Sequence, residues 1–174
     1  MKQLALLRGI NVSGKKKIKM ADLRELLAKH GFMDVATYIQ SGNVLFAERG
    51  SAGEVARELK DIIREHYGYE VPTMVFTAAE WQQFLGNNPF LQNAEVEKTH
   101  LHLTILAQAP AELLQPEIQT TDEYYQQGRA IYLHCPQGYG RTKLTNAFWE
   151  KESGMEATTR NWKSVIKLAE MLDA

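Results

Sequence analysis

Two stretches of this chain match each other: Tyr38-Ile-Gln-Ser-Gly-Asn-Val-Leu-Phe46 and Tyr124-Tyr-Gln-Gln-Gly-Arg-Ala-Ile-Tyr132. The tyrosine, the glutamine, the glycine and the closing aromatic residue coincide without a gap. Each stretch reads as two short strands joined at a glycine, which is typical of a β-hairpin. The same hairpin at the same step of two similar patterns indicates an internal duplication.

The residues around the first hairpin predict a complete α/β unit. Strand-like runs cover residues 4–7, 35–40, 43–47 and 71–76, and helical spacing covers residues 20–27 and 55–67. Two capping boxes, Ser51 to Glu54 and Thr77 to Glu80, each predict the start of a helix. The order is β-α-β-β-α-β with a trailing helix that carries Trp81, which is the ferredoxin-like split pattern.

The second half repeats this order. We expect a strand at 100–106, a short helix from 110–114, two strands around Gly128, a helix with Trp149, a strand at 156–159 and a last helix from Trp162. Thr77 and Trp81 are aligned with Thr158 and Trp162. The predicted fold is therefore α+β, a tandem duplication of two ferredoxin-like units, residues 1–90 and 98–174, with an extra helix after each.

Composition sets limits on the function. The chain has 174 residues and a net charge of −1, so no overall basic field attracts nucleic acid, and such binding would need a local patch. The single cysteine excludes an internal disulfide framework and fits a reducing cytoplasm. The apolar run at the N-terminus is too short for a signal segment or a membrane span. We expect a cytoplasmic protein that does not bind a membrane.

The loop at residues 8–19 is the clearest candidate for function. It holds five basic residues, two glycines and no acid, and it is an insertion that only one of the two copies carries. Gly9 to Lys15 satisfies the P-loop pattern, but Lys16 replaces the Ser/Thr that ligates Mg²⁺, and the helix starts late, near Met20. The loop thus predicts an anion site rather than an NTPase site. The structural alternative is a solvated basic loop anchored in the core by Ile10, Val12 and Ile18.

Three further segments carry polar or basic groups. Residues 137–143 form a second basic, glycine-rich loop, although simple helix entry explains it equally. Thr158 or Thr159 is the expected N-cap of the last helix, which places Arg160 in a first turn that disfavours cations and suggests a partner elsewhere. The polar residues of the first hairpin are consistent with either ligand contact or turn chemistry.

Catalytic patterns are sparse. Cys135 and His134 are neighbours on a strand and face opposite sides, and the five histidines lack metal-site spacing. No paired-carboxylate or Ser/His/Asp pattern is present, and the central strands lack the aromatic pair with which such sheets bind RNA. We expect no metal and no cofactor, and the sequence assigns no reaction.

The chain resembles an uncharacterised, mostly bacterial domain-of-unknown-function family built around an LLRGINV segment. The matching motifs cover nearly the whole chain: residues 6–12, 14–15, 19–20, 37–44, 88–90, 140–144, 158–162 and 167–168. Relatives usually carry Gly-Gly where this chain has Ser13-Gly14, and a serine in place of Thr142. The resemblance implies a tandem of two ferredoxin-like units, highlights the polar loops and implies no established activity.

We therefore predict that one cleft between the two repeats binds a phosphate-containing metabolite, a nucleotide or a nucleic-acid end. Its expected ligand-binding residues are Arg8, Asn11, Lys15, Gln40, Ser41, Asn43, Arg141, Lys143, Arg160 and Asn161. One alternative is an enzyme acting on a phosphorylated or carboxylated small molecule, with Lys15 or Tyr38 as acid/base. Another is a protein-interaction module or homodimer.

Overall fold

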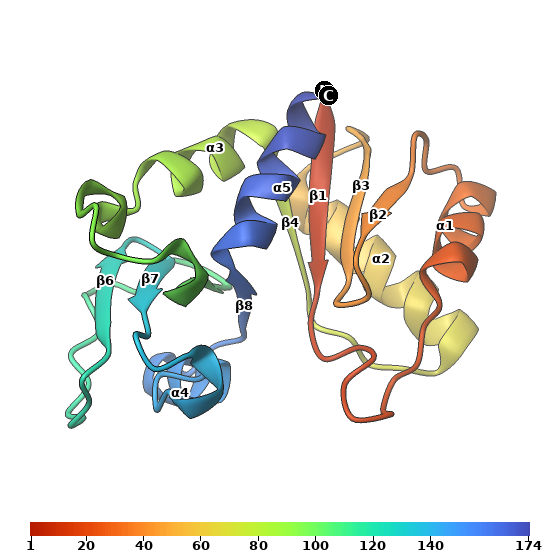
Figure 1. The fold of residues 1–174 in the computed structure, drawn as a ribbon. Helices are drawn as coiled ribbons and strands as arrows, with labels where there is room; N and C mark the ends of the chain where they lie inside the picture. Colours follow the sequence, from red (N-terminus) through yellow and green to blue (C-terminus); the bar gives the residue numbers. More distant parts are fainter. The chain divides into compact units, whose positions relative to one another are not determined.

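The computed structural model describes residues 1–174 (Figure 1). The chain divides into two compact units. The first comprises residues 1–82 together with 168–174, and the second comprises residues 83–167. These bounds differ from the expected 1–90 and 98–174, because residues 168–174 of the last helix belong to the first unit and residues 83–97 belong to the second.

The first unit is a four-stranded antiparallel sheet with the strand order β2-β3-β1-β4. Its strands are β1 (Lys2–Leu7), β2 (Ala36–Tyr38), β3 (Asn43–Ala47) and β4 (Thr73–Thr77). Its helices are α1 (Met20–Lys29), α2 (Ala52–Tyr67) and α3 (Ala78–Gly86), the last of which continues into the second unit. The predicted β-α-β-β-α-β order with a trailing helix is confirmed for this unit.

Local signals set the helix ends of the first unit. Ser51 Oγ accepts a hydrogen bond from the Glu54 amide and donates to the Glu54 carboxylate at 2.6 Å. Gly68 ends α2 at φ +74°, a backbone conformation that glycine adopts without a steric penalty. The second capping box is also present, since Thr77 and Glu80 exchange side-chain to backbone bonds at 2.9 and 3.2 Å.

The core of the first unit lies between one face of the sheet and the helices α1 and α2. Ala5 and Leu7 of β1 pack there with residues of α1 and α2, including Leu23, Leu27 and Leu59, and all five are essentially buried. Leu4 and Leu6 are buried on the opposite face, which agrees with a strand that is apolar on both sides. This packing holds α1 against the sheet and so fixes where the preceding loop ends.

The second unit has a sheet of the same type, ordered β6-β7-β5-β8. Its strands are β5 (Leu101–Leu106), β6 (Glu123–Gln127), β7 (Ala130–His134) and β8 (Ala157–Asn161). The helix α4 (Asn146–Ser153) precedes β8, and α5 (Trp162–Asp173) follows it. Short 3₁₀ turns lie at Pro89–Gln92, Lys98–His100 and Tyr139–Arg141.

The expected helix at 110–114 is wrong, because no helix connects β5 and β6. Pro116 follows Leu114 closely, and proline together with its restraint on the preceding residue leaves too short a run to nucleate a helix. The segment is instead tied to the sheet, since the Leu114 amide donates to Gln126 Oε1 at 2.8 Å. The second unit therefore lacks one helix of the predicted pattern.

The start of the last helix also differs from the expectation. Thr158, Thr159 and Arg160 all lie in β8, and the cap of α5 is Asn161, whose Oδ1 accepts from the Ser164 amide at 2.9 Å. β-Branched threonines fit a strand better than a helix entry. Trp81 is the fourth residue of α3 whereas Trp162 is the first of α5, so their alignment does not join equivalent positions.

No helix of the chain has the length and apolar character needed to cross a membrane.

Candidate functional site

The loop at residues 8–19 leaves β1 at a closely packed turn. The Leu7 amide donates to the Gly42 carbonyl at 2.7 Å, and the Arg8 amide donates to the Pro72 carbonyl at 3.0 Å. The backbone then enters the left-handed region five times, at Gly9, Asn11, Ser13, Gly14 and Lys16. Such conformations are uncommon outside glycine, so the loop has a defined and unusual shape.

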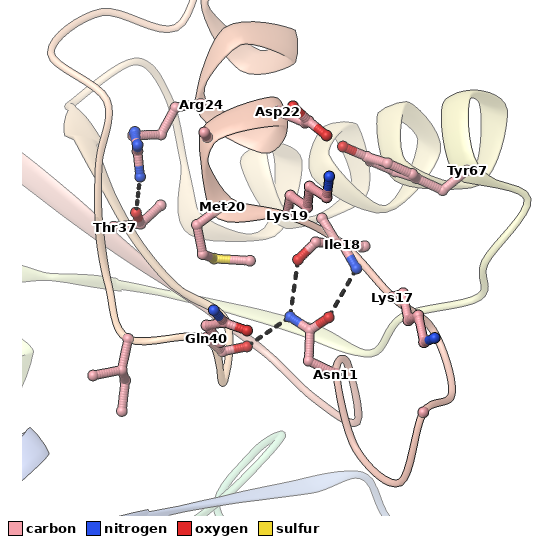
Figure 2. Close-up of a pocket in the computed structure, with 13 residues that line it drawn as sticks. Asn11, Lys17, Ile18, Lys19, Met20, Asp22, Arg24, Thr37, Gln40 and Tyr67 are labelled. Carbon is pink, nitrogen blue, oxygen red and sulfur yellow. Dashed lines mark hydrogen bonds between the residues drawn. The ribbon is translucent and has the colours of Figure 1, made fainter.

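Asn11 holds this loop closed. Its Nδ2 donates to the carbonyls of Ile18 at 2.9 Å and Gln40 at 2.8 Å, and its Oδ1 accepts from the Ile18 amide at 2.9 Å (Figure 2). One side chain thus ties the two ends of the loop together and to the turn of the β2–β3 hairpin. Asn11 was predicted to bind a ligand, and in the structure its side chain holds the loop closed.

The hydrophobic anchors of the loop are two rather than three. Ile10 and Ile18 are buried in the core of the first unit, as expected. Val12 was expected to join them, but its side chain is 58% exposed because it sits at the tip of the turn closed by the Lys15 amide and the Val12 carbonyl. Lys16 donates to the Glu70 carbonyl, whereas Lys15 is exposed.

A pocket of about 870 Å³ opens beside this loop, entirely within the first unit. Its walls come from the end of the loop, the first turns of α1, the turn after β2 and the last residue of α2 (Figure 2). The lining residues are Asn11, Gly14, Lys17, Ile18, Lys19, Met20, Ala21, Asp22, Arg24, Thr37, Ile39, Gln40 and Tyr67. The volume lies in the range of small-molecule sites.

The charges on the pocket wall favour an anion. Three cations line it, Lys17, Lys19 and Arg24, against one acid, Asp22. The first turn of α1 forms part of the wall, and its N-cap residue Lys19 gives the helix no side-chain cap. The free amide groups of a helix N-terminus and the helix dipole both attract negative charge.

Two polar contacts shape the inner part of the pocket. Arg24 Nη1 donates to Thr37 Oγ1 at 2.5 Å, so α1 is fastened to the edge strand β2. The Tyr67 hydroxyl is buried and has no hydrogen-bond partner, and it points toward Asp22 in Figure 2. Burial raises the pKa of Tyr67, and the negative charge of Asp22 raises it further, so the phenol stays protonated at neutral pH.

Ile39 marks the outer rim of the pocket. Its φ is +48° and its side chain is 49% exposed. A β-branched residue in the left-handed region is strained, and strain of this kind concentrates at functional sites. Four of the five non-glycine residues with positive φ, namely Asn11, Ser13, Lys16 and Ile39, lie in the loop or in this turn, and two of them, Asn11 and Ile39, line the pocket.

The other hairpin residues have structural tasks. Asn43 is fully buried, and its Nδ2 donates to the Tyr38 carbonyl at 2.9 Å and to Ser41 Oγ at 3.0 Å. Gly42 lies at φ +91°, where an added Cβ would meet the Leu7 Cβ at 2.7 Å. Turn chemistry therefore explains this part of the motif, as the structural alternative predicted.

A smaller pocket, of about 510 Å³, lies in the second unit. It is lined by Arg141 and Lys143 from the loop after β7, and by the segment 119–122 before β6. Thr142 Oγ1 donates to Asp122 at 2.6 Å and Lys143 Nζ donates to the Gln119 carbonyl at 3.1 Å, so the two segments are joined. Arg141 is exposed on its rim.

The last predicted pair lies around the end of β8. Arg160 is buried, and its Nη1 donates to Thr158 Oγ1 at 2.9 Å and to the Thr159 carbonyl at 3.0 Å. Burial lowers the pKa of Arg160 to about 10, so the guanidinium remains charged at neutral pH. Asn161 caps α5.

The thiol and the histidines form no reactive cluster. Cys135 is buried, and burial raises the pKa of its thiol, so it is not activated as a nucleophile. No group of three or more His, Cys, Asp or Glu side chains is arranged to hold a metal ion.

Four of the ten predicted residues line one of these two pockets, and six line neither: Arg8, Lys15, Ser41, Asn43, Arg160 and Asn161. Asn11 and Gln40 line the pocket of the first unit, Arg141 and Lys143 line that of the second, and the convergence of all ten on one cleft stays a prediction. The prediction missed Lys17, Lys19, Asp22, Arg24, Thr37 and Tyr67. The expected helix start near Met20 was a usable signal for the first three, since it places them at a helix N-terminus.

Residues 1–132 match a family described as "Protein of unknown function (DUF1697)". The chain belongs to this family. The loop at 8–19, the pocket beside it and the first hairpin lie within the matched part of this DUF1697 protein, and the match ends inside β7 of the second hairpin.

A solved structure is similar to this DUF1697 protein over almost its whole length. It is that of the conserved bacterial protein SP0830 from Streptococcus pneumoniae, with a TM-score of 0.74 and 21% sequence identity, covering 98% of each chain. At that identity the likeness shows the fold alone. No curated protein matches the chain.

Proposed function

We propose that this protein binds a phosphate-containing metabolite or nucleotide in the pocket beside the loop at 8–19. The observation that carries the proposal is the composition of the pocket wall, which combines Lys17, Lys19 and Arg24 with a helix N-terminus that has no side-chain cap. Phosphate oxygens accept hydrogen bonds from backbone amides and from cationic side chains alike, and this combination recurs in phosphate sites.

The rigidity of the loop supports binding over a purely solvated loop. Asn11 closes the loop through three hydrogen bonds, and Ile10 and Ile18 hold it to the core. A wall that is already ordered loses little conformational entropy when a ligand binds. A loop that served only as a solvated connection would not need an arrangement with five left-handed residues.

We also infer that the two units arose by duplication of one ferredoxin-like unit. The equal strand orders β2-β3-β1-β4 and β6-β7-β5-β8 support this, as do the matched hairpins at Tyr38 and Tyr124. The second copy would then have lost its first helix, and the loop at 8–19 would belong to one copy only. We also propose a cytoplasmic location and a homodimer.

Isothermal titration with inorganic phosphate and with adenosine 5′-monophosphate tests the binding proposal. We expect both to bind the parent protein, with affinity that falls steeply as salt rises because the contacts are ionic. Replacing Lys17 and Lys19 together, K17Q/K19Q, should weaken binding by about tenfold or more, since two charge-assisted contacts are lost.

The matched control is Lys151→Gln, which removes an exposed lysine of α4 in the second unit. It should leave the affinity unchanged. Equal weakening by K17Q/K19Q and K151Q would indicate a non-specific effect of net charge, and no binding of either anion at low salt would refute the proposal.

A further inference from the structure

We infer that the ligand of the first pocket is a hydroxylated phosphate ester, that is, a sugar phosphate, either free or as the ribose phosphate of a nucleotide. This inference rests on the proposed phosphate binding and names the rest of the ligand. It is drawn from the residues of the pocket wall whose hydrogen-bonding or apolar groups a phosphate group cannot match.

The size of the pocket is the first argument. Inorganic phosphate fills only a small part of about 870 Å³, so a ligand that matches the pocket carries a larger group beside its phosphate. The wall that this group meets is mixed. Met20 and Ile39 offer apolar surface, while Gln40 and Thr37 offer hydrogen-bonding groups.

The carboxylate of Asp22 is the second argument. An ionised carboxylate only accepts hydrogen bonds, and it repels a phosphate. Asp22 therefore suits a part of the ligand that donates hydrogen bonds. A hydroxyl group fits better than an ammonium group, because Lys17, Lys19 and Arg24 line the same pocket and would repel a second cation.

The Tyr67 hydroxyl is the third argument. It is buried, lines the pocket, and makes no hydrogen bond in the free protein. A buried hydroxyl without a partner is costly, and a ligand hydroxyl that reached it after a small movement of the atoms covering it would remove that cost. The Tyr67 hydroxyl points toward Asp22 in Figure 2, so the two groups can serve neighbouring hydroxyls of one sugar.

The wall thus combines groups that suit each part of such a molecule. The cations and the α1 N-terminus suit the phosphate, Asp22 and Tyr67 suit sugar hydroxyls, and Met20 with Ile39 suits the apolar face of the ring. A purely apolar phosphate ester would offer no hydrogen-bond donor to Asp22 and no partner to the Tyr67 hydroxyl.

Isothermal titration of the parent, Asp22→Asn and Tyr67→Phe with inorganic phosphate and with ribose 5-phosphate tests the inference. Ribose 5-phosphate should bind the parent more tightly than phosphate. Each substitution should weaken the binding of ribose 5-phosphate by about tenfold, since one hydrogen bond is lost. The affinity for inorganic phosphate should stay the same or increase. Tyr67→Phe should keep or raise the thermal stability of the parent, because it removes a buried hydroxyl that makes no hydrogen bond there.

Glu152→Gln is the matched control, since it removes an exposed acid of α4 in the second unit. If Asp22→Asn raises the affinity for ribose 5-phosphate as much as the affinity for inorganic phosphate, the carboxylate only repels the ligand and the inference is overturned. If Tyr67→Phe unfolds at a lower temperature and binds ribose 5-phosphate unchanged, the hydroxyl is structural and its part in the inference is wrong.

The same titrations separate this inference from the proposal beneath it. Binding of phosphate without any preference for ribose 5-phosphate contradicts the sugar site and keeps the anion site. If neither inorganic phosphate nor ribose 5-phosphate binds, the anion site and the sugar site are both overturned. Adenosine 5′-monophosphate distinguishes the two sources of the ribose phosphate: tighter binding than ribose 5-phosphate assigns a nucleotide, and equal or weaker binding assigns a free sugar phosphate.

Discussion

At the scale of single residues, a few positions carry constraints that their neighbours do not. Gly42 is one, because its left-handed backbone lies against β1, with the Leu7 carbonyl oxygen 3.0 Å from where a Cβ would be. Ile39, three positions earlier, tolerates the same kind of backbone at a cost. The glycine was recognisable from the sequence as a turn residue, whereas the strain at Ile39 was not, since isoleucine is typical of a strand.

His102 is a second such residue, in β5 of the second unit. It is 9% exposed, its ring stacks on Tyr139 with centroids 4.5 Å apart, and its Nδ1 has no hydrogen-bond partner. Burial lowers the pKa of His102, a bond to the backbone of His100 opposes this shift, and the nearby His100 adds a smaller lowering. The folded state thus holds the imidazole neutral.

This shift predicts a pH-dependent stability. Below the unfolded pKa, about 6.5, the unfolded chain binds a proton at His102 that the folded chain does not, so the free energy of unfolding falls by up to about 1.4 kcal/mol per pH unit until the folded pKa is reached. His102→Phe should reduce this slope. Urea unfolding of both proteins between pH 8 and pH 5 measures it, with pH 8 as the reference. Identical slopes would show that the burial of His102 has no such effect.

At the scale of elements, the loop at 8–19 shows which structural features the local sequence pattern predicts and which it does not. The late start of α1 at Met20 and the burial of Ile10 and Ile18 followed from the pattern of apolar residues. The contacts of Asn11 did not, because an asparagine at a left-handed position is equally consistent with an exposed turn. The expected helix at 110–114 failed for a different reason. Its first residues favour a helix, but the segment is too short to form one on its own.

Asn11→Ala tests whether one side chain holds the loop. It removes three hydrogen bonds and places alanine at φ +55°, so we expect a loss of about 2–3 kcal/mol in stability and faster hydrogen exchange at the Ile18 amide. Thermal unfolding and amide exchange measure the two effects.

Asn11→Gly is the matched comparison, because it removes the same hydrogen bonds and keeps the backbone free to adopt this conformation. It should lose less stability than Asn11→Ala. Unchanged exchange at Ile18 in both variants would mean that the hydrogen bonds of Asn11 do not restrain the loop.

At the scale of the whole molecule, the two ends of the chain belong to one unit. Residues 168–174 are assigned to the first unit, and the two ends of the chain lie close together in Figure 1. Lys2 Nζ donates to the Met171 carbonyl and to an oxygen of Ala174. Gln82 Nε2 also donates to the Asp173 carboxylate at 2.8 Å. The expected division at residue 90 treated the duplication as two consecutive domains and missed this return of the chain.

Deletion of residues 168–174 should destabilise the first unit. Leu168 and Leu172 are buried, and the loss of two buried leucines costs about 3–6 kcal/mol, which lowers the unfolding temperature by about 10 °C or more. Thermal unfolding by circular dichroism measures the change. Deletion of residues 173–174 alone removes no buried residue and should have a small effect. Equal effects of the two deletions would contradict the role of the leucines.

The sequence by itself determined the features that depend on neighbours in the chain. These are the capping boxes at Ser51 and Thr77, the glycine that ends α2, the two hairpins and most of the strands, because each depends on interactions within a few residues. The tertiary structure alone decided which lysines line the pocket, what Tyr67 faces and where the C-terminus lies. Those features depend on packing that brings residues 11–24, 37–40 and 67 to one place, and no local pattern encodes such contacts.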